Sequence, residues 1–284
     1  MREFKDRVAV ITGGASGIGL GMAQAFADRG MKLVLADVDQ GALDTAVAQF
    51  KANGIEAIGQ HCDVSKLEAV QALAQTTLDT YGAVHVLCNN AGVGLTTSTM
   101  NIKLEDWRWM IDIDLWGPIY GIEVFLPLIE QQGEGHVCST SSMAGLTSSR
   151  SLGAYNVAKR GVVALMTTLE RELRSRNSAI TASVLCPGPI NTNISSNSVA
   201  NRPARPDSST PRKPRDPAAQ AIADRKQAKI QALLEEGMQP LEVGNLVADA
   251  IANDKFWILT HPEWIKGLQK ELDAMRDDQT LTKG

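Results

Sequence analysis

Three side chains in the middle of the chain, Ser142, Tyr155 and Lys159, have the types and spacing needed to move a proton at an oxygen atom. A tyrosine is a poor base at its ordinary pKa of about 10. Tyr155 and Lys159 are four residues apart, so on a helix they share one face. A unit charge about 4 Å away, at an effective dielectric constant of about 20, contributes roughly 4 kcal/mol, or about three pKa units. Lys159 would thus make Tyr155 a general base near neutral pH, while Ser142 orients the reacting oxygen. Taken alone, the same spacing also fits an ordinary surface pair.

Alternation of apolar runs with longer amphipathic segments predicts the elements that must position these side chains. The alternation favours an α/β protein with a parallel sheet covered on both faces, with right-handed crossovers. The expected strands are 8–12, 32–37, 55–60, 84–92, 136–142, 180–188 and 256–260. The expected helices are 17–29, 40–53, 67–81, 104–131 with an interruption near Gly117-Pro118, 153–174, 217–236, 241–253 and 262–275.

A glycine-rich turn, ITGGASGIG, joins the first expected strand to the first expected helix. Gly13, Gly17 and Gly19 permit a tight turn, close backbone approach to a ligand and close packing of the helix on the strand. The free N–H groups at the start of the helix, with its dipole, make an anion site that suits a pyrophosphate. The alternative is an ordinary strand–helix turn.

Asp37 ends the second expected strand, where a carboxylate can accept hydrogen bonds from the adenosine ribose hydroxyls of a dinucleotide. The same charge would repel a 2′-phosphate. No Arg or Lys lies within the glycine turn or directly after Asp37 to offset it. We therefore expect NAD rather than NADP; the alternative role for Asp37 is to cap the next helix.

The composition excludes several other classes of protein. The net charge is −4, which gives no indication of a nucleic-acid surface. The four cysteines form no CxxC pair, which argues against a zinc site or a redox motif. With neither a signal-peptide pattern nor a long uncharged apolar run, we expect a cytoplasmic protein without a membrane partner and without a bound metal.

With these residues in view, the chain resembles the short-chain dehydrogenases/reductases. The glycine spacing T-G-x-x-x-G-x-G is met from Thr12 to Gly19, and an N-N-A-G motif lies at 89–92. The Y-x-x-x-K motif is Tyr155 to Lys159, with Ser142 thirteen residues before the tyrosine. A P-G motif follows at Pro187-Gly188, with Thr192 after it, and Asp63 matches the acidic residue that meets the adenine. The resemblance is close over residues 5–193 and loose beyond them.

The resemblance implies a doubly wound Rossmann fold: one domain over 1–284, with seven parallel strands in the order 3-2-1-4-5-6-7. It implies a homodimer or homotetramer formed through the helices near 104–131 and 153–174. Lys159 would also bind the nicotinamide ribose, and the loop from Pro187 to Thr192 the carboxamide. The residues expected to bind the cofactor are Gly13, Ser16, Gly17, Ile18, Gly19, Asp37, Asp63, Val64, Asn90, Ala91, Gly92, Tyr155, Lys159, Pro187, Gly188, Ile190 and Thr192.

One position departs from the family pattern. Where the family has a catalytic Asn in N-L-x-G, this chain has Asp114 in DIDLWG. Its carboxylate could pair with Lys159 and weaken the pull of the lysine on Tyr155. We expect an active enzyme with an altered pH optimum, with Asp114 counted among the catalytic residues; the rival interpretation is a damaged site.

The chain is also longer than compact members of the family. We expect a substrate lid over 193–240, beginning as an extended, Ser- and Pro-rich loop, and a C-terminal extension over 261–284. The loop carries a basic run, which is either a solvated flap or a contact for an anionic partner: Arg202, Arg205, Arg212, Lys213 and Arg215. Side chains that would line a bulky apolar pocket, or equally belong to the core, are Trp116, Met143, Leu146, Leu152, Ile194, Leu233 and Met238.

These observations predict an NAD-dependent oxidoreductase that interconverts a secondary alcohol and a ketone, with Tyr155 as general acid/base. The segments GHVCSTSSMAGL and FWILTHPE resemble those of bacterial members acting on bulky aryl or alicyclic substrates. Two alternatives remain. One is an NAD-binding or redox-sensing protein without turnover, which Asp114 would suit. The other is an NADPH-dependent reductase of carrier-bound acyl groups, which Asp37 opposes and the arginines of the 202–215 loop would suit.

Overall fold

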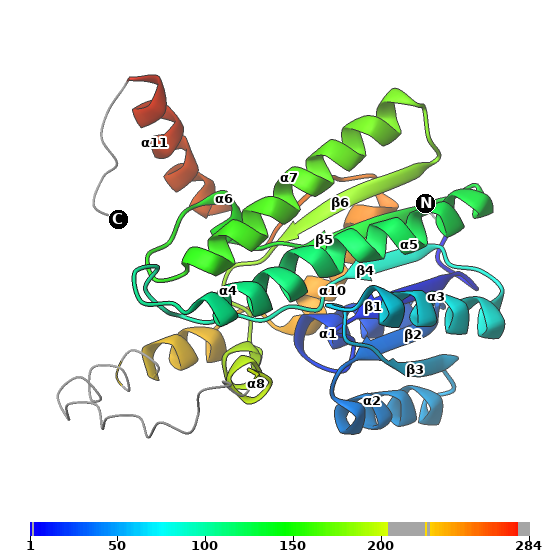
Figure 1. Cartoon of the computed structure of the whole chain (residues 1–284). Coiled ribbons are helices and arrows are strands. Elements are labelled where there is room, and N and C mark those ends of the chain that lie inside the picture. Colours follow the sequence, from blue (N-terminus) through cyan, green and yellow to red (C-terminus); the bar gives the residue numbers. More distant parts are fainter. Residues whose placement is uncertain (2, 204–224, 226–227, 278–284) are drawn as a thin grey trace.

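The computed structural model describes residues 1, 3–203, 225 and 228–277 of the 284-residue chain. Its centre is a parallel sheet of seven strands in the order β3-β2-β1-β4-β5-β6-β7, which confirms the expected doubly wound topology (Figure 1). The reversal of strand order between β1 and β4 opens the carboxyl edge of the sheet to a ligand. The strands are β1 Val8–Thr12, β2 Lys32–Asp37, β3 Ala57–His61, β4 Val86–Asn89, β5 Gly135–Thr140, β6 Ile180–Cys186 and β7 Trp257–Leu259.

Alternate side chains of the strands enter two separate apolar layers, because successive residues of a strand point to opposite faces. Ala9 and Ile11 of β1 lie in the layer under α1, α2 and α10, whereas Val8 and Val10 lie in the layer under α3, α5 and α7. The helices on the first face are α1 Gly17–Ala27, α2 Gln40–Ala52 and α10 Pro240–Ala252. Those on the second face are α3 Leu67–Tyr81, α5 Gly117–Gln132 and α7 Gly153–Ser175, in front of the sheet in Figure 1.

The long helix expected over 104–131 is interrupted directly before Gly117-Pro118, close to the predicted position. Helix α4, Leu104–Ile111, passes into a π-helical turn, Asp112–Trp116, before α5 begins at Gly117. The wider π turn directs Asp114 inward, where the residue is 0% exposed. Such turns inside helices are frequent at functional sites.

Two short helices were not expected from the sequence. Helix α6, Met143–Leu146, begins directly after Ser142, and helix α8, Ile194–Ala200, replaces the start of the extended loop. Serine and asparagine are weak helix formers. Helix α8 is fixed instead by Ser198, whose hydroxyl donates to the Ile194 carbonyl (2.6 Å) and accepts from the Gly94 N–H (2.8 Å).

The remaining elements fall in the two ranges that were expected to form a lid, 193–240, and a C-terminal extension, 261–284. Residues 228–235 are helical, so only part of the helix expected over 217–236 falls in the described chain. Arg205, Arg212, Lys213 and Arg215 lie outside the described residues. After β7 the chain forms a 3-10 turn, Pro262–Trp264, and helix α11, Ile265–Arg276, which projects from the body in Figure 1.

Candidate active site

The carboxyl ends of the strands border a cavity of about 680 Å³. All but two of the side chains predicted to bind a cofactor or act in catalysis line it. The exceptions are Gly19 and Asp114, which lie behind the wall. The predicted residues on the wall are Gly13, Ser16, Gly17, Ile18, Asp37, Asp63, Val64, Asn90, Ala91, Gly92, Ser142, Tyr155, Lys159, Pro187, Gly188, Ile190 and Thr192.

The glycine turn brings the start of α1 to the cavity. Gly13 has φ +62°, and a Cβ there would lie 2.9 Å from the Ala91 Cα. Gly19 does not line the cavity because it packs on the turn: a Cβ there would lie 2.0 Å from the Gly13 carbonyl oxygen. The Ser16 side chain makes no capping hydrogen bond to α1. The first turn of α1 therefore presents uncapped N–H groups and the positive end of its dipole.

Asp37 lines the cavity and does not cap α2. One carboxylate oxygen of Asp37 accepts from the Ala15 N–H (3.1 Å) and the other from the Asp39 N–H (3.1 Å). Asp39 caps α2 instead, because its carboxylate accepts from the Ala42 N–H (3.0 Å). Asp37 thus joins the glycine turn to the end of β2. Asp63 follows β3 and also lines the cavity, as does the cation of Lys66 three residues later.

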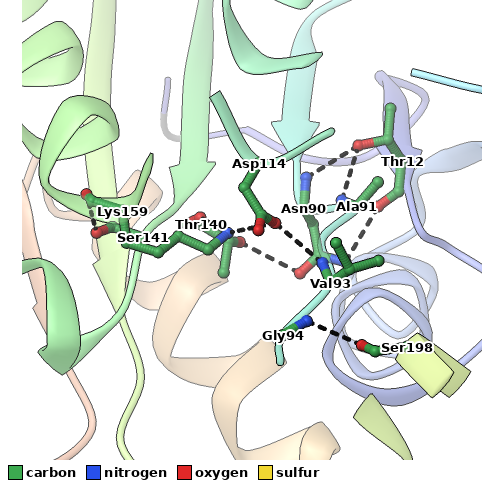
Figure 2. Close-up of polar contacts among 10 residues, drawn as sticks. All are labelled: Thr12, Asn90, Ala91, Val93, Gly94, Asp114, Thr140, Ser141, Lys159 and Ser198. Carbon is green, nitrogen blue, oxygen red and sulfur yellow. Dashed lines mark hydrogen bonds and ion pairs between the residues drawn. The ribbon is translucent and has the colours of Figure 1, made fainter. Parts of the chain in front are cut away.

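Asn90 ties the ends of three strands together (Figure 2). Its amide nitrogen donates to the Thr12 carbonyl (3.0 Å), and its side-chain oxygen accepts from the Thr140 hydroxyl (3.2 Å). The Thr12 hydroxyl accepts from the backbone N–H groups of Asn90 (2.9 Å) and Ala91 (3.1 Å). These bonds fix the loop after β4 against the glycine turn and account for the types at positions 12 and 90.

Lys159 is buried at the wall of the cavity, in a cage of polar groups. Its Nζ donates to the Thr140 carbonyl (3.1 Å) and lies 3.3 Å from Oδ1 of Asp114 (Figure 2). The Ser141 hydroxyl donates to the Lys159 carbonyl (2.7 Å), which ties α7 to the end of β5. Burial lowers the pKa of Lys159, but the charges of Asp114 and Tyr155 raise it more, so that its pKa lies above the ordinary value. Lys159 is therefore protonated at neutral pH.

Asp114 is a buried carboxylate with one satisfied oxygen. Oδ1 accepts from the Val93 N–H (2.9 Å) as well as facing Lys159. Oδ2 has no hydrogen-bond partner among the described residues. Burial raises the pKa of Asp114, against the opposing effects of Lys159 and of the Val93 N–H. The predicted pairing of Asp114 with Lys159 is present in the structure.

Tyr155 does not have the lowered pKa that its spacing from Lys159 predicted. The Lys159 Nζ lies 5.6 Å from the centroid of the tyrosine ring. Burial raises the pKa of Tyr155 above its ordinary value; Lys159 and the polar contact with the Ser142 side chain act in the opposite direction, and Asp114 adds to the rise. Burial, which the spacing of Tyr155 and Lys159 does not reveal, outweighs the lysine, so the prediction of a lowered pKa was wrong for the groups that the protein itself supplies.

Ser142 lies two residues after the end of β5 and lines the cavity. It caps the short helix α6, because its oxygen accepts from the Ala144 N–H (3.1 Å). Its hydroxyl donates to the Pro187 carbonyl (3.3 Å). The sequence elements that carry Ser142, Tyr155 and Lys159 therefore bring these side chains to one wall.

Apart from Ile194, two helix faces on the cavity were not predicted from the sequence. Each follows the i, i+3, i+4 and i+7 spacing of a single helix face, which is the signal that could have found it. Arg202, after α8, binds Asp106 of α4 through two hydrogen bonds, one of them 2.6 Å, and so joins the two helices. The face from α4 and the π turn comprises Glu105, Arg108, Trp109, Asp112 and Ile113, and that of α8 comprises Ile194, Asn197, Ser198 and Asn201.

Most of the apolar side chains expected in the pocket do not line it. Trp116 is 44% exposed and its ring lies against that of Tyr120 in a tilted arrangement, with ring centroids 5.5 Å apart. Met143 and Leu146 belong to the core layer under α3, α5 and α7. Of the side chains expected there, only Ile194 lines the cavity. Leu234 lines it in place of the expected Leu233. Leu152 and Met238 do not line it.

Comparisons with known proteins agree with this geometry. The family model described as short chain dehydrogenase matches residues 7–203. A short chain dehydrogenase/reductase from Burkholderia phymatum, solved in complex with NAD, is 37% identical with a TM-score of 0.91, over 100% of this chain and 99% of that one. A C alpha-dehydrogenase from Sphingobium sp. (strain NBRC 103272 / SYK-6) is 31% identical over 98% of this chain and 88% of the relative. A 3-oxoacyl-(acyl-carrier-protein) reductase from Synechocystis sp. (strain ATCC 27184 / PCC 6803 / Kazusa) is 36% identical over 69% of this chain and 79% of the relative.

The chain belongs to the short-chain dehydrogenase family of oxidoreductases. This family binds a nicotinamide dinucleotide. Within the described part of the chain, no helix is long and apolar enough to cross a membrane. The same residues hold no group of three or more acidic, His or Cys side chains that could bind a metal ion.

Proposed function

We propose that the protein is an NAD-dependent oxidoreductase that interconverts a bulky secondary alcohol and its ketone. The observation that carries the proposal is the placement of Ser142 and Tyr155 on one wall of the cavity, with protonated Lys159 beneath them and the start of α1 on the same cavity. One end of the cavity is thus suited to proton transfer and the other to binding an anion.

The residues present fit a dinucleotide. The uncapped turn of α1 and the space that a Cβ at Gly13 would fill suit a pyrophosphate, and Asp37 suits the ribose hydroxyls of adenosine. Asp63 and Val64 would flank the adenine, whereas Ile190 and Thr192 would meet the carboxamide. When bound, the nicotinamide accepts or donates the hydride, and its oxidised ring carries a positive charge.

In this proposal Tyr155, Ser142, Lys159 and Asp114 have distinct tasks in the reaction. Tyr155 takes the hydroxyl proton as general base and returns it as general acid during ketone reduction. Ser142 leaves the Pro187 carbonyl to hydrogen-bond the reacting oxygen. Lys159 holds the tyrosinate by its charge, and Asp114 fixes Lys159 while it weakens that charge.

We infer a preference for NAD over NADP from Asp37. Both of its carboxylate oxygens accept backbone N–H groups, so its charge is fixed where a 2′-phosphate would lie. Lys66 lines the same cavity and is a cation that would favour NADP. The alternative function, reduction of carrier-bound acyl groups, would use NADPH. The cofactor preference therefore also distinguishes that function from the proposed alcohol dehydrogenase.

A bulky aromatic or alicyclic substrate is supported by the wall that α4 and α8 add beyond the cofactor residues. Trp109, Ile113 and Ile194 offer apolar contact there, and the asparagines of α8 offer hydrogen bonds. The name of the Sphingobium relative, a C alpha-dehydrogenase, agrees with oxidation at a carbinol carbon. We further propose a homodimer or homotetramer, which light scattering after gel filtration would test.

The test measures NADH formation by the purified protein with a panel of bulky secondary alcohols, with NAD⁺ and NADP⁺ in parallel. We expect turnover with NAD⁺ that a Tyr155→Phe variant loses by at least about a hundredfold. A matched control is Tyr120→Phe, which removes a phenol that does not line the cavity. Tight NADH binding without turnover of any alcohol or ketone would favour the redox-sensing alternative, and preferential use of NADPH would contradict the proposal.

A further inference from the structure

The peptide group between Pro187 and Gly188 is held from both sides. Its carbonyl accepts from the Met143 N–H (2.9 Å) and from the Ser142 hydroxyl (3.3 Å). Its N–H, on Gly188, donates to the Thr260 hydroxyl oxygen (2.9 Å). A single planar group therefore joins Ser142 on one side of the cavity wall to Thr260, directly after β7, on the other.

Thr260 is itself oriented by the next residue. Its Oγ1 lies 2.7 Å from Nδ1 of His261, and the threonine is only 8% exposed. When Nδ1 carries no proton, the hydroxyl donates to the imidazole, and its oxygen is then a better acceptor for the Gly188 N–H. A series of hydrogen bonds thus runs from His261 through Thr260 and the peptide to Ser142. Because hydrogen bonds in series polarise one another, each bond strengthens the next.

The imidazole is fixed in place by its own contacts. Its ring centroid lies 5.4 Å from that of Trp264. A Cβ on Gly188 would lie 2.5 Å from Nδ1, so the glycine is what allows the ring to approach the peptide. Further along, Ile265 and Leu268 pack against the core layer that contains Met143. The whole segment follows residue 203, where the match to the family model ends.

We propose that Thr260 and His261 form a positioning pair for the reaction: they fix the Pro187–Gly188 peptide and, through it, the resting orientation of Ser142 and the loop that runs to Thr192. Neither side chain lines the cavity, so both act through the peptide. The inference rests on the proposed function, because it assigns Ser142 to the substrate and the loop to the nicotinamide. It gives the start of the C-terminal extension a catalytic purpose.

The test compares Thr260→Val, which keeps the shape and removes the hydroxyl, with Thr260→Ser, which restores it. His261→Leu and His261→Asn form the second pair, since an asparagine can present a polar atom near the position of Nδ1. For each variant we would measure kcat at saturating NAD⁺, the melting temperature, and the Kd values of NADH and of ADP-ribose, which lacks the nicotinamide.

Loss of one buried hydrogen bond should lower kcat about tenfold in Thr260→Val and His261→Leu and weaken NADH binding about threefold to tenfold. ADP-ribose binding should stay within about twofold of wild type, and the Ser and Asn variants should recover most of the loss. Wild-type kcat and NADH affinity in Thr260→Val would overturn the proposal. If NADH and ADP-ribose binding weakened equally, or if Thr260→Ser did not restore kcat, the pair would have only a structural role and the proposal would be overturned as well. If the wild type oxidised no alcohol, the proposed function would fail, while the comparison of NADH with ADP-ribose would still decide this inference.

Discussion

Replacing Asp114 by asparagine should shift the pH dependence of alcohol oxidation to lower pH. The substitution keeps an oxygen for the Val93 N–H and removes the negative charge 3.3 Å from Lys159. Asp114 is among the causes that raise the pKa of Tyr155, and Lys159 is the main charge that lowers it. Without the carboxylate, the tyrosinate has a stronger electrostatic partner and forms at lower pH.

The size of the shift follows from the distances. Lys159 Nζ lies 3.3 Å from the Asp114 carboxylate and 5.6 Å from the centroid of the Tyr155 ring, which puts the carboxylate within about 9 Å of that centroid. At about 9 Å and an effective dielectric constant of about 20, one charge contributes about 1.8 kcal/mol, or about 1.4 pKa units. Oxidation requires the deprotonated tyrosine, so the rising limb of kcat/KM against pH should move down by about one to 1.5 units.

The assay records kcat/KM for an alcohol that the enzyme oxidises with NAD⁺, from pH 5.5 to 10.5. Glu123→Gln is the matched control, because it removes a carboxylate from the exposed face of α5, and its profile should overlay that of wild type. Superimposable profiles for wild type and Asp114→Asn would refute the electrostatic role of Asp114. A shift to higher pH would refute the sign of the argument.

Three further outcomes follow from the described contacts. Arg202→Ala removes the bonds that join α8 to Asp106 of α4, and should raise KM about fivefold with little change in kcat, as steady-state kinetics would reveal; an unchanged KM would contradict a role for the pair in holding α8. Asp37→Asn keeps the shape but removes the charge, and should raise the ratio of kcat/KM with NADP⁺ to that with NAD⁺ at least about tenfold; an unchanged ratio would remove Asp37 from cofactor selection. Burial lowers the pKa of His136 to about 3. Between about pH 6.5 and 3, this imidazole therefore binds a proton in the unfolded chain but not in the folded chain. The free energy of unfolding by urea should therefore fall between about pH 6.5 and 3, by up to about 1.4 kcal/mol per pH unit from this group, and His136→Gln should flatten that slope; equal slopes would exclude His136 as the cause.

Features encoded by local geometry were predictable from the sequence. The glycine turn was found because Gly13 and Gly17 adopt positive φ, a requirement that restricts the residue type. The strand order agrees with the family that the motifs indicated. The pairing of Asp114 with Lys159 was anticipated because a carboxylate stood where an amide was expected.

Features set by tertiary context were not predictable in the same way. Helix α8 forms from weak helix formers because Ser198 binds the backbone of Gly94, in the loop after β4. Trp109 and Trp116 are seven residues apart and would share one face of a regular α-helix. The π turn rotates Trp116 away from that face, so only Trp109 lines the cavity. The π turn itself could not be predicted from the spacing of apolar residues. The pKa of Tyr155 depends on burial, which a spacing argument cannot supply.

The central claim is that hydride exchange at a carbinol carbon depends on Tyr155. The most direct test incubates the protein with NADH carrying two deuterium atoms at C4 and a panel of bulky aryl and alicyclic ketones, followed by mass spectrometry of the products. We expect alcohols that have gained a single deuterium with the wild-type protein, and none above background with Tyr155→Phe. Equal labelling by both proteins would contradict the role of Tyr155, and tight NADH binding with no labelled alcohol from any ketone would contradict the proposed reaction.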